Sequence, residues 1–318
     1  MTMAFTTLIP AFKPAYLAEL LRALQVQTVL PARVIISDDS PDGAFLDALS
    51  APAVQPLVQR LNLSVVQGPR RGGWANCQQL LTLYGGATSH FHLLMDDDIP
   101  YPSFYARHAE AHALATSGCV VSRRWYASET GLPLASLPVP PALDAMPQRL
   151  ISLPAPLLFE QIVGTSNNWL GELSNTTFAA ACLDDMRRPS IGGINLHGLE
   201  DIGTMLMCAQ RGPLAYINEH LGFFRTSAGQ NSQQPLGRAF KLGVLGWIAL
   251  ALAALRAGLL TEPLVRAAIV HSADVVRRRY AAEPDIEPFI ALLPQLAANG
   301  EADEEFIRLW HDFGATRA

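Results

Sequence analysis

The sequence lacks a strong charge of either sign and lacks any basic run interleaved with aromatic side chains. Its 23 Lys and Arg residues and 28 Asp and Glu residues give a formal net charge of -5 over 318 residues. Nucleic-acid-binding domains cluster Lys and Arg to contact phosphates. The composition therefore argues against a nucleic-acid partner, and the length is ample for a sizeable core.

Closely spaced cysteines and a signal peptide are also lacking. None of the four cysteines forms the close pair typical of a zinc site or a redox motif, and each lies among apolar residues, which predicts buried thiols. They are Cys77, Cys119, Cys182 and Cys208. The start MTMAFTTLIPAF predicts a first strand rather than a leader. We therefore expect a reducing, cytoplasmic setting.

No apolar run is as long as a membrane-spanning helix. The uncharged stretch from Leu242 to Leu255 has 14 residues, whereas a spanning helix needs about 20. It predicts a buried helix or one that lies on a membrane. The basic run Arg277 to Arg279 predicts a solvated face, with peripheral contact at the inner face of the membrane as the alternative.

Two nucleotide-binding fingerprints are missing as well. Neither GxxxxGK[ST] nor GxGxxG occurs, so ATP-driven and dinucleotide-dependent functions lose their main signal. A sugar-nucleotide pyrophosphorylase usually has a glycine-rich basic loop directly after its first strand. This chain has PAFKPAY there.

The sequence does contain an alternation of short β-rich runs and amphipathic helical patterns. It predicts an α/β fold with a mainly parallel central sheet flanked by helices. Helices are expected to open at Pro14, to centre on Leu80, and to start at Glu200 or Asp201. The expected strands cover residues 6–10, 33–37, 63–67, 91–95, 119–122 and 176–180.

Two later segments differ in pattern from the first part. Periodicity fails from Ser128 to Pro156, where prolines interrupt the chain and predict an irregular surface excursion. After about Gln234 only helical spacing remains. We expect one domain over 1–235 and a C-terminal helical annex over 236–318.

Carboxylates follow two of the predicted strands directly. Asp96, Asp97 and Asp98 follow one, and Asp38 and Asp39 follow another. In open α/β sheets ligands bind at the carboxyl ends of strands. Adjacent carboxylates suit Mg²⁺ or Mn²⁺ bridging two phosphates, and single ones accept hydrogen bonds from a nucleobase or a ribose. Acidic helix caps and ordinary turns are the competing interpretations.

A basic, glycine-containing loop precedes another predicted helix. GPRRGGWANC places Arg70, Arg71, Gly72 and Gly73 before the helix start. Helix N-termini favour anions and arginine suits phosphates, so this loop is a candidate phosphate contact.

In this order the motifs resemble the family 2 glycosyltransferases with the GT-A fold. The matching segments are TTLIPAFKP, ISDDSPDG, GPRRGGWANC, MDDDIPYPSF, GLEDIGTML and LGFFRTSAGQNSQ, over roughly residues 5 to 235. Each motif alone is weak, whereas the ordered set is specific. The resemblance implies a bacterial, inverting, metal-dependent enzyme. It also implies a non-processive one, because the spanning helices and QxxRW-type motif of the processive synthases are missing.

The resemblance also implies roles for individual residues. Pro10, Ala11 and Phe12 would line the base pocket, with Asp38 and Asp39 addressing base or ribose. Asp96 and Asp98 would be the ends of the family's DxD motif, with Asp98 directly on the metal and Asp96 as its helper, nearer the ribose or an ordered water. Asp97 is adjacent but would point elsewhere, because successive side chains of a strand alternate faces. Arg71 and Arg225 would offset the diphosphate charge. Each of these residues lies in one of the motifs quoted above.

The acidic pair Glu200 and Asp201 is the candidate catalytic base. An inverting transferase needs a carboxylate to deprotonate the acceptor hydroxyl, and Asp201 is the residue we favour, with Glu200 as its partner. Helix capping is the competing interpretation. Just upstream, Trp169, Asn168 and Glu172 are candidates for sugar or acceptor binding, and a core tryptophan is equally compatible with the pattern.

One position departs from the family pattern. Where many relatives carry a metal-binding histidine, this chain has Ser227. His220 or His197 could substitute, or water could fill the position. The loop through Gln230 and Asn231 is expected to close over the nucleotide.

The predicted function is transfer of a sugar from a UDP- or dTDP-sugar to an acceptor hydroxyl with Mn²⁺ or Mg²⁺. The acceptor would be a glycan, a lipid-linked glycan or a protein, in bacterial surface glycan assembly or protein glycosylation. A pyrophosphorylase and a non-catalytic nucleotide- or glycan-binding protein are the alternatives. Nucleotide binding that requires metal would separate the enzymes from a scaffold.

Overall fold

The computed structural model describes residues 3–115, 117–227, 230 and 234–315. It forms two compact units that interleave along the chain. The first unit comprises Met1–Leu153, Leu170–Arg187 and Arg211–Thr226, and the second comprises Pro154–Trp169, Arg188–Gln210 and Ser227–Ala318. The prediction of one domain over residues 1–235 and a helical annex over 236–318 remains a proposal.

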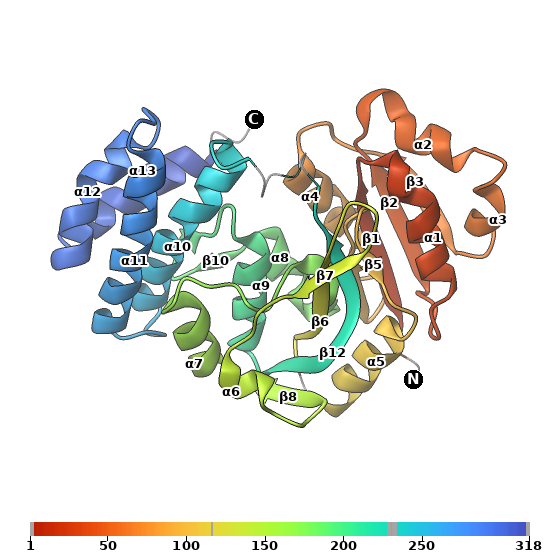
Figure 1. Ribbon diagram of the computed structural model, residues 1–318, viewed down its shortest axis with the longest axis horizontal. Helices are drawn as coiled ribbons and strands as arrows, with labels where there is room; N and C mark the ends of the chain where they lie inside the picture. The colour runs from red at the N-terminus through yellow and green to blue at the C-terminus, as the bar shows by residue number, and fades with distance from the viewer. Residues whose placement is uncertain (1–2, 116, 228–229, 231–233, 316–318) are drawn as a thin grey trace. The chain divides into compact units, whose positions relative to one another are not determined.

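A ten-stranded mixed sheet forms the centre of the first unit. Its strands are β1 (Phe5–Ala11), β2 (Arg33–Asp38), β3 (Leu63–Gln67), β4 (His90–Leu93), β5 (Ile99–Pro100), β6 (Cys119–Ala127), β7 (Pro133–Ser136), β8 (Leu150–Leu153), β9 (Thr176–Ala179) and β12 (Leu214–Arg225). The main order is β3-β2-β1-β4-β9-β6-β12-β5. Figure 1 shows β12 as a long curved strand, and it pairs in parallel with β6.

Six of these strands share one direction. β3, β2, β1 and β4 pair in parallel, β9 is antiparallel to both β4 and β6, and β12 is again parallel to β6. The prediction of a mainly parallel central sheet flanked by helices is confirmed.

Helices of the first unit bury apolar stripes against the sheet. They are α1 (Leu17–Gln25), α2 (Ala44–Leu49), α3 (Gln55–Val58), α4 (Gly73–Tyr84), α5 (Phe104–Leu114), α6 (Pro141–Asp144) and α8 (Leu183–Arg187), with short turns η1 (Pro14–Tyr16), η2 (Pro41–Gly43), η4 (Leu173–Asn175) and η5 (Ala180–Cys182). The predicted stripe of α1 is buried, including Leu20, Leu21 and Leu24. These side chains pack with strand residues such as Ile9 and Ile36 in one core cluster. This packing holds α1 against the sheet.

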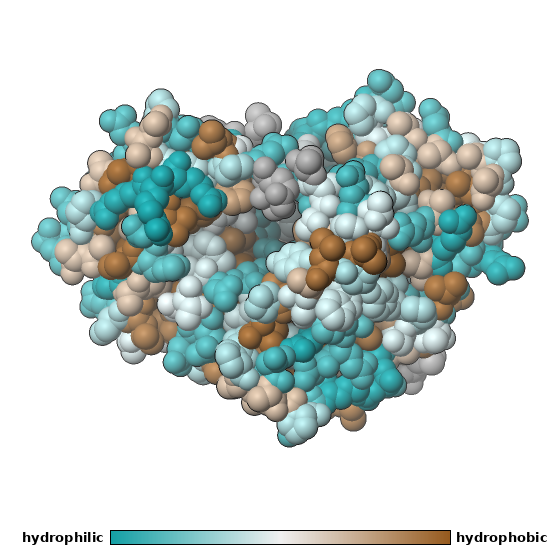
Figure 2. Space-filling view, viewed as in Figure 1, coloured by the Kyte–Doolittle hydropathy of each residue, from teal (hydrophilic) through white to brown (hydrophobic). Residues whose placement is uncertain are grey.

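The hairpin at β7 carries exposed apolar residues. Leu132 and Leu134 are 64% and 62% exposed, and Figure 2 shows a hydrophobic patch over β7. The hairpin and β8 lie within the segment expected to be irregular, so that expectation is wrong for these short strands. β8 forms because it pairs with β12, from Leu153 opposite Leu214 to Leu150 opposite Ile217.

The second unit is mainly helical. Its elements are α7 (Ala155–Leu158), η3 (Phe159–Val163), β10 (Ser190–Ile191), β11 (Ile194–Asn195), α9 (Glu200–Ala209), α10 (Arg238–Arg256), α11 (Glu262–Tyr280), α12 (Glu287–Ala298) and α13 (Asp303–Ala315). The four C-terminal helices confirm the predicted helical content after Gln234 (Figure 1). Lys241, on α10, forms ion pairs with Glu283 and Asp285 at 2.6 and 2.7 Å.

Helix α10 contains the apolar run noted in the sequence. Among the described residues it is the one helix long and apolar enough to cross a membrane, and 61% of its apolar window is buried. The core helix of a globular unit has the same properties. The buried-helix interpretation therefore fits the structure.

Candidate active site

The carboxyl ends of the co-directional strands meet at one edge of the sheet in the first unit. β1 ends at Ala11, β2 at Asp38, β3 at Gln67, β4 just before the acidic triplet, and β12 at Arg225. Such an edge is where open α/β sheets bind ligands. The structure thus brings together the predicted site residues Arg225 and Asp98, which lie 127 positions apart in the chain.

Asp96 joins the end of β1 to the loop after β4. Its Oδ2 accepts hydrogen bonds from the backbone N–H groups of Phe12 and Lys13, both at 2.6 Å. Burial raises the pKa of Asp96 to about 6, and the two N–H donors partly oppose that rise. The contact explains why the PAFKP segment and the triplet occur together.

Asp97 is paired with a lysine that the sequence reasoning did not single out. Its Oδ2 contacts Lys13 Nζ in an ion pair. Burial lowers the pKa of Lys13, but the hydrogen bond and the negative charges of Asp97 and Asp96 outweigh burial and raise it. The position of Lys13 directly after the first strand is the sequence signal that could have marked it.

Asp98 is the most deeply buried carboxylate of the triplet, at 1% exposure. Its Oδ1 accepts the backbone N–H of Arg225 at 3.0 Å, and its Oδ2 has no hydrogen-bond partner among the described residues. Burial and the charge of Asp97 raise the pKa of Asp98 well above its usual range, against the effects of Ser174 and Arg225. A buried carboxylate oxygen in this state requires a proton or a cation.

The carboxylates of the triplet suit a divalent cation chemically. Carboxylate oxygens are the ligands that Mg²⁺ and Mn²⁺ prefer. Asp98 Oδ2, which accepts no hydrogen bond from the described residues, could coordinate such an ion. The residues therefore fit the metal that the family resemblance implies.

Arg225 connects four parts of the site edge. The guanidinium is 1% exposed. It donates to the Asp97 carbonyl at 2.8 Å, the Glu129 carbonyl at 2.6 Å and Glu19 Oε2 at 2.7 Å. It also lies 4.4 Å from the ring centroid of Tyr16. In this structure Arg225 holds the triplet loop in place, and its contact with a diphosphate remains a proposal.

Asp38 forms a hydrogen-bonded turn at the end of β2. Its Oδ1 accepts the backbone N–H and the hydroxyl of Ser40 at 2.9 and 2.5 Å, and its Oδ2 accepts the N–H of Leu46 at 2.9 Å. These bonds are the turn chemistry that competed with nucleotide binding. Oδ1 already accepts two hydrogen bonds, whereas Oδ2 accepts one and keeps a further lone pair, so a contact with a base or ribose is still open to Oδ2.

Asp39 is packed against the loop that follows β3. Its Oδ1 accepts the backbone N–H of Arg70, and its own N–H donates to Ala11 O at 2.9 Å. Gly68 fits here because a Cβ would lie 2.6 Å from Asp39 Oδ1 and 2.9 Å from Asp38 O. The ends of β1, β2 and β3 are thereby held close together.

The N-terminus of α4 is fixed to the same edge. Asn76 Nδ2 donates to Ser37 O at 2.9 Å, and Gln79 Nε2 donates to Gln67 O at 2.6 Å. Gly72, with φ of 88°, is the N-cap, and Arg71 before it is exposed. The loop thus presents an arginine and a helix N-terminus together, as phosphate contacts require.

The predicted base-pocket residues differ in exposure. Pro10 and Ala11 are buried in β1, whereas Phe12 is 55% exposed directly beyond the strand. An exposed aromatic ring at a ligand edge offers a stacking surface.

Glu172 forms a bidentate ion pair with a second residue that the sequence reasoning missed. Arg124 Nε donates to Glu172 Oε2 at 2.7 Å, and Arg124 Nη2 contacts Oε1. The guanidinium lies 4.0 Å from the ring centroid of Tyr126. With Ser174 and Phe224 the pair lines a small pocket. The adjacent arginines Arg123 and Arg124, directly after a predicted strand, were the available signal.

Glu200 and Asp201 lie in the second unit, in the first turn of α9. Both are half-buried. The Glu200 carbonyl accepts the Thr204 hydroxyl at 2.7 Å, and Asp201 Oδ1 accepts the N–H of Ile202 at 2.7 Å. The predicted helix start is confirmed, and the role as catalytic base remains a proposal.

Trp169 and Asn168 also belong to the second unit. Trp169 is 2% exposed, and its Nε1 donates to Gln161 O at 3.3 Å. This placement favours the core-tryptophan interpretation over stacking on a sugar. Asn168 is half-buried, and its contact with an acceptor remains a prediction.

The alternative histidine ligands are occupied in packing. His220 stacks on Trp125 with ring centroids 3.9 Å apart, and its Nε2 lies 2.8 Å from Ser136 Oγ. His197 packs against Trp310 in the second unit. Ser227 N–H donates to Gln230 Oε1, and Asn231 of the expected nucleotide loop lies outside the described residues.

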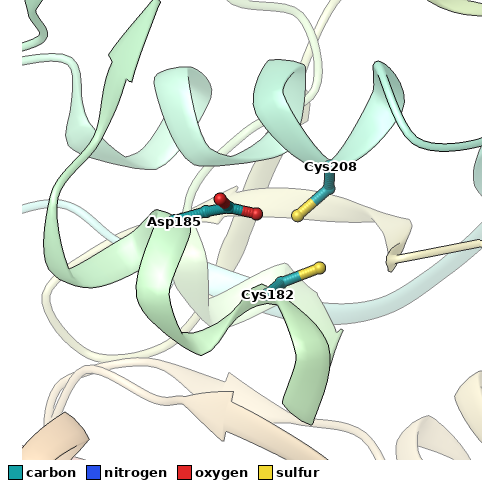
Figure 3. A group of neighbouring side chains, drawn as sticks. All are labelled: Cys182, Asp185 and Cys208. Carbon is teal, nitrogen blue, oxygen red and sulfur yellow. The ribbon is translucent and has the colours of Figure 1, made fainter.

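The cysteines are buried thiols, as predicted. Cys182 Sγ donates to Gly118 O at 3.3 Å. Figure 3 shows Cys182 and Asp185 as neighbouring side chains at η5 and α8. Asp185 forms an ion pair with Arg211 at 2.6 Å. The bonds of Asp185 are those of a structural ion pair.

Comparison with known proteins yields structural likeness without sequence likeness. No protein-family model matches the chain, and no curated protein matches it in sequence. Among solved structures, S. aureus TarS 1–349 in complex with UDP-GlcNAc has a TM-score of 0.58 and 14% identity, covering 95% of this chain and 92% of that one. The TarS 1–349 complex with UDP has a TM-score of 0.52 at the same identity and coverage.

A longer TarS structure matches with a TM-score of 0.55 and 15% identity over 98% of this chain, which spans 55% of that one. Identity at this level establishes architecture alone. The sheet order and these likenesses confirm the family resemblance at the level of the fold, and the chain has the GT-A fold.

Proposed function

We propose that this chain is a metal-dependent inverting glycosyltransferase that moves a sugar from a nucleoside diphosphate donor to an acceptor hydroxyl. The observation that supports this most is the convergence of Phe12, Asp38 and the acidic triplet on one strand edge. UDP-GlcNAc, which TarS binds, is the first donor to test. UDP-hexoses and dTDP-sugars share the pyrimidine that such a pocket would hold.

The donor would be bound along the strand edge of the first unit. The base would stack on exposed Phe12 beside Pro10 and Ala11, with Asp38 and Asp39 accepting hydrogen bonds from base or ribose. Arg71 and the N-terminus of α4 would face the diphosphate, with Arg225 holding the loop that carries the triplet. Asp98 and Asp96 would hold the divalent cation, which supplies charge compensation for the departing diphosphate.

The chemical step would be a single displacement. The acceptor oxygen attacks the anomeric carbon, the bond from that carbon to the diphosphate oxygen breaks, and the diphosphate leaves with the electron pair. Asp201 would accept the acceptor proton, with Glu200 as its neighbour. Glu172 in the first unit and Asn168 in the second would each contact a sugar or acceptor hydroxyl.

Two substitutions test the two roles separately. Asp98→Ala should abolish transfer and weaken Mn²⁺-dependent UDP binding, whereas Asp201→Ala should abolish transfer and leave UDP binding unchanged. Asp184→Ala is the matched control because its side chain is 93% exposed. Transfer is measured with UDP-GlcNAc and other UDP- and dTDP-sugars, and binding by calorimetry. Full activity of either test variant would refute the assignment.

A further inference from the structure

Lysine is rare in this chain, and one of the two lysines lies on the acidic triplet. The 23 basic residues include only Lys13 and Lys241 as lysines. Lys241 is buried in the second unit and bound by Glu283 and Asp285. Lys13 instead follows β1 at the candidate site.

Lys13 binds two members of the triplet through different groups. Its backbone N–H donates to Asp96 Oδ2 at 2.6 Å, and its ammonium contacts Asp97 Oδ2. The backbone bond and the following Pro14 fix the main chain. The flexible four-carbon stem leaves the ammonium free to change partner.

The Lys13 side chain is more exposed to solvent than the Asp97 side chain with which it pairs. The side chain of Asp97 is 7% exposed, whereas that of Lys13 is 30% exposed. The carboxylate therefore depends on a nearby positive charge, while the ammonium can reach water or a ligand. A compact, mobile cation on a fixed acidic loop is the arrangement of a replaceable counter-ion.

We propose that the Lys13 ammonium is a resident cation of the triplet that competes with the divalent metal and supports binding of the nucleoside diphosphate when metal is scarce. The inference rests on the proposed function, because it takes a nucleoside diphosphate as the ligand. A divalent ion that approaches Asp96 and Asp98 meets the positive charge of Lys13. That repulsion weakens metal binding.

Direct titration with Mn²⁺ tests the competition without any turnover. The full chain, Lys13→Met and Lys13→Arg are titrated with MnCl₂ alone, and free Mn²⁺ is measured by electron paramagnetic resonance. Lys13→Met should bind Mn²⁺ about tenfold more tightly, which corresponds to about 1.4 kcal/mol. Lys13→Arg keeps the charge and should match the unsubstituted chain.

Equal Mn²⁺ affinity of Lys13→Met and the unsubstituted chain would overturn the proposal. Thermal unfolding and circular dichroism establish that the variants are folded, and Lys13→Gln is the second neutral variant if Lys13→Met does not fold.

Binding of UDP with EDTA present tests the contact with the diphosphate. Lys13→Met should bind UDP about tenfold more weakly than the unsubstituted chain, and Lys13→Arg should retain binding. Equal affinities would show that Lys13 does not support the diphosphate. Failure of the unsubstituted chain to bind UDP even with saturating Mn²⁺ would refute the proposed function, whereas the Mn²⁺ titration alone decides the competition.

Discussion

The stability of the first unit should fall on mild acidification because of buried histidines. His112 on α5 is 9% exposed, its Nε2 lies 3.0 Å from Thr177 Oγ1, and its ring centroid lies 4.2 Å from that of His90, with the ring planes tilted by 51°. His108 Nδ1 lies 2.8 Å from the same Thr177 hydroxyl. Burial and the charge of His90 lower the pKa of His112 from 6.5 to about 3, against the effects of Ser117 and Thr177.

The sign and size of the effect follow from that shift. The folded state holds His112 neutral, whereas the unfolded chain takes up a proton below pH 6.5. Stability is therefore fully present above that pH and is lost progressively as the pH falls toward the folded pKa. Each pH unit in this window costs about 1.4 kcal/mol. Acidification to about pH 5 should thus cost about 2 kcal/mol through this one residue.

The His112→Gln variant isolates this contribution. Glutamine can keep the hydrogen bond to Thr177 but does not titrate. The free energy of unfolding is measured by urea denaturation at about pH 7.5 and about pH 5 for both proteins. The loss on acidification should be about 2 kcal/mol smaller in the variant. His271→Gln, at an exposed position of α11, is the control, and an identical pH dependence for His112→Gln and the unsubstituted chain would refute the reasoning.

Three further substitutions test the packing around the site. Asp38→Ala removes three hydrogen bonds and should lower the free energy of unfolding by about 2 kcal/mol in urea denaturation. Gly68→Ala should displace Asp39 and weaken UDP binding in calorimetry, because the new Cβ would lie 2.6 Å from Asp39 Oδ1; unchanged affinity would contradict the placement of this loop at the donor. Glu172→Gln should destabilise by about 2 kcal/mol, more than Arg124→Met, because it leaves the Arg124 side chain, 2% exposed, without its bidentate partner, whereas the Glu172 side chain is 28% exposed and can be solvated.

The strands with continuous apolar runs were predictable from the sequence. β1, β2, β3, β4, β6 and β9 each cover most of an expected range, because strands inside a covered sheet read as short apolar segments bounded by turn residues. The helical C-terminal part was equally clear from its spacing.

The long strand β12 was not predicted. Its centre contains Asn218, Glu219, His220 and Gly222, which break the apolar pattern. The strand forms because distant partners supply its pairing: β8 and β6 along its length and β5 near its end, with register shifts between Ile217 and Phe223. Such long-range pairing overrides local preference and leaves no signal in a short window.

The site residues show the same division between local and distant information. Carboxylates that directly follow strands marked the edge correctly. The partners that hold them did not show in the sequence, since Lys13, Arg124 and Arg225 reach their acidic residues across large sequence separations. A sequence motif identifies a charged side chain. Only the fold shows which neighbouring residue already forms an ion pair or a hydrogen bond with it.

The position of Arg225 has a consequence for folding during synthesis. Its contacts with Glu19 and Asp98 span 206 and 127 residues of chain. Until β12 has been synthesised, the edge of β6 that pairs with it is open. The loop that carries the acidic triplet also lacks its hydrogen bonds to Arg225. Closing such long loops is slow, and an open strand edge promotes association with other chains. This edge of the sheet is therefore completed late, and a nascent chain that ends before Leu214 should depend on chaperones to remain soluble.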